Sequence, residues 1–229
     1  MLSALYATAE IEHIGSPEGF SSTYTELFGD PFAYEALLIP HDLAQVHLDL
    51  PFESGISWNF TGGPHNAWRD SPPWSAIDFA PQLASTGCHE TYDWVTSMAT
   101  GVITRIQDGV VVLNLDSDGY EQTGWTIVYV HIRPDLTKIH VGQSVDAGQR
   151  LGHASCDGGL SSTSSHIHLT RKYNGEWIEA GGPLPFKLDG WIVENEHRPY
   201  EGKLVRVADG KVLTACSCVS EENQIMVRD

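Results

Sequence analysis

Basic residues are scarce in this chain of 229 residues. Lys and Arg number 13 against 30 Asp and Glu, so the formal net charge at pH 7 is −17. Nucleic-acid binding needs clustered Lys and Arg against the phosphates, and attachment to an anionic membrane surface needs the same charge. The composition therefore argues against nucleic acid and anionic membranes as partners, and it names no other partner.

Long apolar runs are also missing. No segment approaches the roughly 18 uninterrupted apolar residues of a spanning helix, and the first residues, MLSALYATAE, lack the basic start of a secretory signal. The sequence therefore predicts a chain that is soluble as given, with no stable membrane insertion. It still fits the processed part of a secreted precursor, because leaders and pro-segments are removed from mature proteins.

Three common catalytic signatures are absent as well: GxSxG, the P-loop and HExxH. What the chain does have is 41% hydrophobic and 10% aromatic residues, which is enough for a packed core and excludes a disordered acidic tail. Its length predicts one large domain, or one domain with an extension.

Short β-prone runs punctuated by glycine begin near Leu50. SAIDFA alternates, so Ala76, Asp78 and Ala80 share one face of a strand. The runs GVITRI and GVVVLNL flank the turn at 107–109, which indicates a hairpin, and WTIVYVHI and HIHLTRKY are further strands. We therefore predict a mainly β fold, an antiparallel sandwich or barrel-like core with long loops.

The two ends of the chain have no strong pattern. Within residues 1–47, SPEGFSSTYTELFGD is loop-like and EALLIPHDLAQVHLDL is broken by Pro40; beyond about Asp209 the chain is acidic and loop-like apart from KVLTACSCV. The predicted organisation is an N-terminal extension or the remnant of an upstream region over 1–47, one domain over 48–208 and a C-terminal tail over 209–229.

Polar side chains interrupt the apolar strands. His166 and His168 are two residues apart in a strand, so both imidazoles project from one face, about 7 Å apart. Asp78 stands in an apolar strand, where a carboxylate costs several kcal/mol unless it is paired or bound to a cation. His131 ends another apolar strand, and His65 follows the rigid turn GGP. A shared zinc ion would satisfy these groups; the plain alternative is satisfied core histidines and a turn aspartate.

This set of residue types suits hydrolysis. Two histidines and one carboxylate leave a tetrahedral Zn²⁺ with its fourth position open to water. The cation lowers the pKa of that water and stabilises the oxyanion formed from a carbonyl, while two spare histidines move protons. The residues therefore predict cleavage of an amide bond in a zinc cleft surrounded by the long loops.

The order of these residues resembles a known family. Along the chain they are His65, Asp78, His131, His166 and His168. This order is similar to that of the lysostaphin-like (LytM-type) zinc metalloendopeptidases, which cut bacterial cell-wall peptides. Asp78 follows His65 by 13 residues, a spacing that resembles the beta-lytic, staphylolytic branch rather than the HxxxD of lysostaphin and LytM. The strings TGGPH, SAIDFA, GWTIVYVHI, GQSVDAGQRLGH and SSHIHLTRKYNGEW carry the resemblance over most of residues 50–178.

The resemblance implies roles for the five residues. His65, Asp78 and His168 match the ligands of one zinc ion per chain, and His131 and His166 match the catalytic histidines. Which of the two catalytic histidines removes the proton of the water stays open.

The resemblance also implies a setting. It implies a monomeric enzyme, secreted or in the cell envelope, that acts on peptidoglycan peptides or other peptides rich in small residues. It implies disulfides, for which Cys88–Cys156 is the first pairing and Cys216–Cys218 the residual one. The alternative is a non-catalytic cell-wall binding or amidase-activating module of the same fold; such relatives usually lose ligands, whereas this chain keeps all five positions.

Tryptophans flank the predicted site. They are Trp58, Trp68, Trp74 and Trp94. We expect most of them to pack in the core or loops and one or two to line a groove for a peptide or glycan.

Overall fold

A computed structural model describes residues 17–29, 39–68, 72–82, 87–159 and 162–227. The chain divides into two units, Met1–Leu38 and Ile39–Asp229. Much of the predicted N-terminal extension, residues 1–16 and 30–38, lies outside the described residues.

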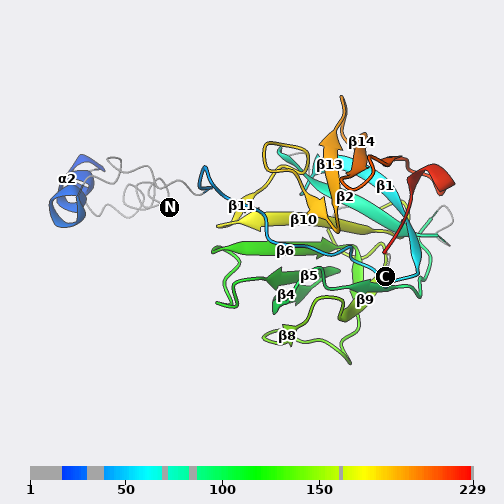
Figure 1. The fold of residues 1–229 in the computed structure, drawn as a ribbon. Coiled ribbons are helices and arrows are strands. Elements are labelled where there is room, and N and C mark those ends of the chain that lie inside the picture. Colours follow the sequence, from blue (N-terminus) through cyan, green and yellow to red (C-terminus); the bar gives the residue numbers. More distant parts are fainter. Residues whose placement is uncertain (1–16, 30–38, 69–71, 83–86, 160–161, 228–229) are drawn as a thin grey trace. The chain divides into compact units, whose positions relative to one another are not determined.

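The described element of the first unit is the helix α2 (Pro17–Phe28) (Figure 1). The loop predicted for this stretch is therefore wrong. Pro17 suits the first helical position because the amide it lacks has no partner there, and Gly29, with φ of 84°, follows the last turn in a left-handed conformation that commonly ends helices. Phe20, Tyr24 and Leu27 do stand at helical spacing, but the glycine, serines and threonines among them are weak helix formers and typical of loops.

The second unit is built on an open nine-stranded antiparallel sheet. The strand order is β16-β1-β2-β10-β6-β5-β4-β8, with β11 beside β10. The strands are β1 (Ser57–Asn66), β2 (Trp74–Pro81), β4 (Gly101–Gln107), β5 (Val110–Asn114), β6 (Trp125–Val130), β8 (Ser144–Val145), β10 (Ile167–Tyr173), β11 (Glu176–Trp177) and β16 (Gln224–Met226). Because β16 and β8 are the two ends of this order, the sheet does not close into a barrel.

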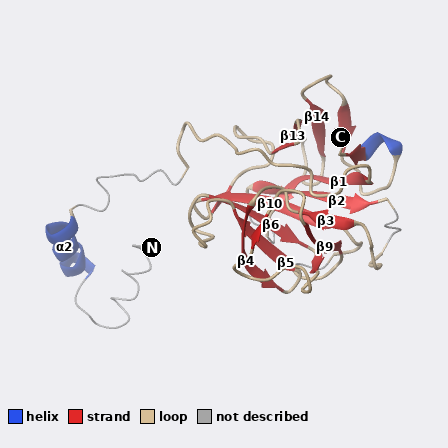
Figure 2. Cartoon of the chain, turned by 60° about the horizontal axis from the view of Figure 1, so that its bottom comes forward, coloured by secondary structure: helices blue, strands red, loops and turns tan. Residues whose placement is uncertain are grey.

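Two smaller antiparallel sheets complete the unit. One has the order β12 (Lys187–Leu188), β13 (Trp191–Asn195), β14 (Gly202–Arg206) and β15 (Val212–Thr214), and the other β3 (Trp94–Thr96), β9 (Arg150–Ala154) and β7 (Ile132–Pro134). Strands dominate this unit (Figure 2), which confirms the predicted mainly β, antiparallel class. Among the described residues, no helix is long and apolar enough to cross a membrane.

Around β2 and β10, one face of the main sheet packs in the apolar core and the other carries polar side chains. Ile77, Phe79 and Leu169 are fully buried in one large apolar cluster, which also takes residues from both smaller sheets. Because side chains alternate along a strand, Asp78 and His168 project from the opposite face. The alternation expected for SAIDFA thus separates the core from a polar face.

The predicted hairpin at 107–109 joins β4 to β5. Asp108 has φ of 46° and Gly109 has φ of 71°. Two successive residues with positive φ make a tight turn whose twist matches that of the flanking strands, and Asp-Gly is a favoured pair for it.

The four cysteines form two disulfides, Cys88–Cys156 and Cys216–Cys218. Both pairings agree with those implied by the family resemblance.

The C-terminal stretch contributes to two sheets, the four-stranded sheet through β15 and the main sheet through β16. It contributes β15, the short 3₁₀ helix η1 (Glu221–Asn223) and β16, and Ile225 of β16 pairs with Trp58 of β1. The strand β15 lies in the run KVLTACSCV, which is the exception to the predicted loop-like tail, whereas the loop-like character predicted for the rest is wrong over η1 and β16. The three-residue β16 is too short for a readable pattern, and its pairing joins distant parts of the chain.

Asn223 holds this stretch in place. Its buried side-chain amide donates hydrogen bonds to the carbonyl oxygens of Phe60, Cys216 and Cys218, at 3.1, 3.2 and 2.9 Å. Its Oδ1 accepts from Nδ2 of Asn59 at 2.7 Å. One fully buried amide thus links β1 to the disulfide turn beside it.

We expect Asn223→Ala to lower the free energy of unfolding by about 2–4 kcal/mol, because it leaves several buried polar groups without partners. Urea unfolding measures the change. The exposed neighbour Glu222 is the control, and Glu222→Ala should stay within about 0.5 kcal/mol of the parent protein. Equal stability of the two variants would contradict this role for Asn223.

Candidate functional site

The polar cluster lies where β1, β2 and β10 run side by side. Asp78 of β2 is directly opposite His168 of β10 on one side and Gly62 of β1 on the other. Directly opposed residues share a face, so the carboxylate and the imidazole meet. A Cβ on Gly62 would lie 2.4 Å from Oδ2 of Asp78, so the glycine leaves the space that the carboxylate fills.

An irregular stretch of β1 directs His65 toward this point. The register of β1 against β2 shifts between Gly62 and His65. Here β1 forms backbone hydrogen bonds with a later segment of the chain. The amide of Gly63 donates to the carbonyl of Tyr200 at 2.8 Å, and the amide of Tyr200 donates to the carbonyl of Pro64 at 3.1 Å. The Tyr200 ring stacks on the His65 ring with centroids 4.0 Å apart. Sequence patterns did not reveal Tyr200, because its role depends on a contact between distant segments.

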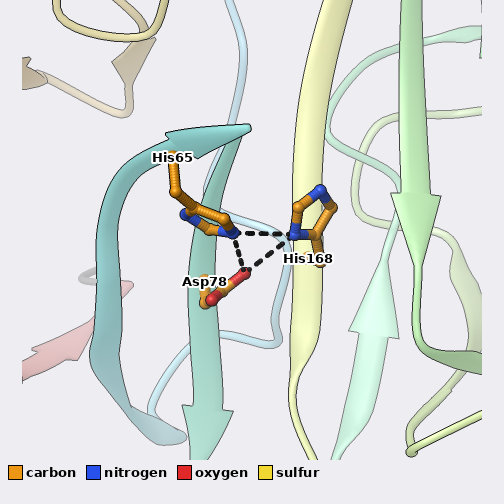
Figure 3. Close-up of side chains that lie close together, drawn as sticks. All are labelled: His65, Asp78 and His168. Carbon is orange, nitrogen blue, oxygen red and sulfur yellow. Dashed lines mark hydrogen bonds and ion pairs between the residues drawn. The ribbon is translucent and has the colours of Figure 1, made fainter. Parts of the chain in front are cut away.

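Three ligand atoms converge at short distances (Figure 3). Nε2 of His65 lies 3.0 Å from Nδ1 of His168. Oδ1 of Asp78 lies 3.2 Å from Nδ1 of His168 and 3.4 Å from Nε2 of His65. All three residues are buried.

Backbone carbonyls decide which nitrogens carry protons. Nδ1 of His65 lies 2.8 Å from the carbonyl oxygen of Gly63, and Nε2 of His168 lies 3.1 Å from that of Ala67. A carbonyl oxygen only accepts hydrogen bonds, so these two nitrogens are the donors. In a neutral ring the other nitrogen, which faces Asp78, then carries a lone pair and no proton. Oδ1 of Asp78 correspondingly has no hydrogen-bond donor among the described residues. Three acceptor atoms facing one point need a cation between them.

The charge states agree with this conclusion. Burial raises the pKa of Asp78, but the neighbouring His65, His166 and His168 outweigh it and hold the pKa of the carboxyl below its usual range. Burial lowers the pKa of His65, with His168 and His166 adding to the effect and Asp78 opposing it. Burial, reinforced by His166 and His168, lowers the pKa of His131 to about 4. At neutral pH Asp78 is thus an anion, and the rings of His65 and His131 are uncharged.

The other two predicted residues lie beside this cluster. His166 precedes β10, and its Nε2 is 3.7 Å from Oδ1 of Asp78. His131 stands between β6 and β7 with φ of 59°, a conformation that few non-glycine residues adopt and that recurs at functional sites. The rings of His131 and His166 have centroids 4.7 Å apart. Nδ1 of each ring donates to a backbone carbonyl, at 3.1 Å to Asp157 and 2.8 Å to Ser164.

A cleft of about 650 Å³ gives access to all five residues. Its other lining residues include Trp68, Thr163, Tyr200, Glu201 and Ser217. No Lys or Arg is among the cleft-lining residues in the described part of the chain. Of the four flanking tryptophans, Trp68 lines the cleft and is 42% exposed, whereas Trp58 is fully buried in the core.

Comparison with known proteins supports a common origin. No protein-family model matches the chain. Protease LasA from two strains of Pseudomonas aeruginosa is 30% identical over 202 residues, which cover 76% of this chain and 44% of LasA. The chain thus spans less than half the length of these curated relatives. The solved structure of the deep-sea M23 metalloprotease pseudoalterin matches with a TM-score of 0.59 and 23% identity, over 75% of this chain and 96% of that one. This second likeness shows a shared fold.

The converging acceptor atoms predict that the chain binds one divalent transition-metal ion. Zinc added to metal-free protein should raise its unfolding temperature, since an ion at 100 times its Kd adds about 2.7 kcal/mol of stability. Asp78→Asn keeps the shape but removes the charge, and should abolish the response. His140→Ala, in an exposed loop, should leave it intact. Calorimetric titration gives the stoichiometry; an unchanged response in the Asp78 variant would contradict the assignment.

Proposed function

The chain belongs to the lysostaphin-like (LytM-type) peptidase family, and from this premise we propose that it is a zinc-dependent endopeptidase that hydrolyses peptide bonds in the stems or cross-bridges of bacterial cell-wall peptidoglycan. The observation that carries the proposal is the His65–Asp78–His168 cluster, with two further histidines beside it in an open cleft. A non-catalytic module has no need for this set.

The spacing of the cluster supports zinc. Ligand atoms that share a tetrahedral zinc ion at about 2.0–2.1 Å lie about 3.3–3.4 Å from one another. The three ligand atoms here are separated by 3.0, 3.2 and 3.4 Å, so they can form one face of such a tetrahedron. Two imidazoles and one carboxylate are also the donor set of catalytic zinc sites, which keep one position open.

In this proposal His65, Asp78 and His168 hold the ion. Zinc supplies a Lewis acid that activates water and polarises the carbonyl of the scissile bond. The carbonyls of Gly63 and Ala67 orient the two imidazoles by accepting from their outer nitrogens. Neither ring can then turn its lone pair away without losing a hydrogen bond.

His131 and His166 supply proton transfer. Each donates its Nδ1 proton to a backbone carbonyl, which leaves Nε2 as the nitrogen that takes up or returns a proton. Burial lowers the pKa of His131 to about 4, so its ring is uncharged at neutral pH and can accept a proton. The two rings are close enough to act as one coupled pair.

The cleft suits an uncharged or basic peptide of small residues. Its charged lining residues in the described part of the chain are Asp78 and Glu201, and the whole chain carries −17. Long-range attraction therefore does not bring an anionic cell wall to this protein, and recognition rests on short-range contacts in the cleft.

The setting we propose is outside the cell or in the cell envelope. Two disulfides among the described residues suit an oxidising compartment. The predicted division into 1–47, 48–208 and 209–229 stays a prediction, as does the monomeric state.

Incubation with defined peptidoglycan fragments, with and without a chelator, tests the activity directly. Mass spectrometry of the products should show cleavage of a peptide bond that is lost on chelation and restored by zinc. Intact fragments under all conditions, with fragments still bound to the protein, would favour the non-catalytic module instead.

His166→Ala should separate metal binding from turnover. The variant loses a proton-transfer group but no ligand, so we expect zinc content to stay at one per chain while the rate falls about 10²–10⁴-fold. Zinc is measured by atomic emission and the rate on a peptide fragment. His140→Ala provides the matched control, with both quantities unchanged. Full activity of the His166 variant would refute the role given to this residue.

A further inference from the structure

Ser155 lies between the two histidines assigned to proton transfer. It follows the last residue of β9, and its amide donates to the carbonyl of His131 at 2.7 Å. On its other side, its carbonyl accepts from the amide of His166 at 3.2 Å. The backbone of Ser155 thus forms hydrogen bonds with the backbones of both histidines.

The hydroxyl of Ser155 closes a circuit of hydrogen bonds. Its Oγ accepts from the amide of Asp157 at 2.9 Å. The carbonyl of Asp157 accepts from Nδ1 of His131 at 3.1 Å, and the carbonyl of His131 accepts from the amide of Ser155. Three hydrogen bonds therefore join Ser155, Asp157 and His131 in a ring.

The surroundings of Asp157 explain why this hydroxyl matters. Asp157 is an exposed loop residue. On one side it meets the β4–β5 turn so closely that a Cβ on Gly109 would lie 2.3 Å from the Asp157 carbonyl oxygen. On the other side, Cys156 is tied to Cys88. These contacts confine the loop, and the Ser155 hydroxyl adds a hydrogen bond that holds the amide of Asp157, one peptide group before the carbonyl that accepts from His131.

We propose that Ser155 is a positioning residue for the peptidase reaction, acting through Asp157 to fix the tautomer and orientation of His131. This inference rests on the function proposed above. Ser155 is largely buried and is not among the cleft-lining residues, so it acts on the ring rather than on substrate. With Nδ1 held as a donor, His131 keeps Nε2 available in the cleft.

Ser155→Thr and Ser155→Val are a matched pair that isolates the hydroxyl, because the two side chains have nearly the same shape. In the zinc-loaded protein, the Val variant should have a kcat at least tenfold below that of the Thr variant, with KM within twofold and zinc content unchanged. Ser155→Ala, which adds no atoms, should behave as the Val variant does. Equal kcat in the Thr and Val variants, or a wild-type kcat in the Ala variant, would overturn the proposal.

A second readout does not depend on activity. In protein labelled with ¹⁵N-histidine, the ring signals of His131, identified by their loss in His131→Gln, should report a protonated Nδ1 in the parent and Thr variant. The Val and Ala variants should show a mixture of tautomers. If the parent protein hydrolyses no peptide, the proposed function fails, and the NMR comparison still decides whether Ser155 positions His131; identical ring signals in all variants would overturn that role.

Discussion

An ionised carboxylate buried among imidazole lone pairs is the constraint on which this site depends. Oδ1 of Asp78 and one nitrogen each of His65 and His168 lie within 3.4 Å of one another, and backbone carbonyls hold the outer proton of each ring. Acceptors this close repel unless a cation separates them. The neighbouring backbone is adapted to that requirement, because Gly62 leaves room for the carboxylate.

The antiparallel sheet makes this arrangement stiff. Asp78 and His168 sit on strands whose alternate residues, Ile77 and Leu169, are fully buried in the core. A rotation that moved either ligand would expose or overpack its apolar neighbours, and both changes are destabilising. Hydrophobic packing on one face thus preorganises the polar groups on the other.

Local signals explain how much could be predicted from the sequence. The alternation around Asp78, the turn at 107–109 and the histidine pair at the start of β10 are each visible within a few residues, and the structure brings the five predicted site residues into one cleft. Tyr200 and Ser155 escaped prediction because their roles depend on contacts with segments distant in the chain. The helix α2 escapes prediction because glycine, serine and threonine, which are weak helix formers, make up much of its sequence, and β16 because three residues carry no period.

The pairing of β16 with β1 also bears on when the protein matures during synthesis. The strand that carries His65 has a paired strand on one side only until residues 224–226 pair with it, and Asn59 lacks its hydrogen bond to Asn223 until then. A chain that leaves the ribosome from its N-terminus cannot complete this edge until those late residues have emerged. Contacts between such distant residues also slow folding, since a long loop must close first. A growing chain therefore carries all three ligand residues before it carries the strand that completes the outer edge of β1.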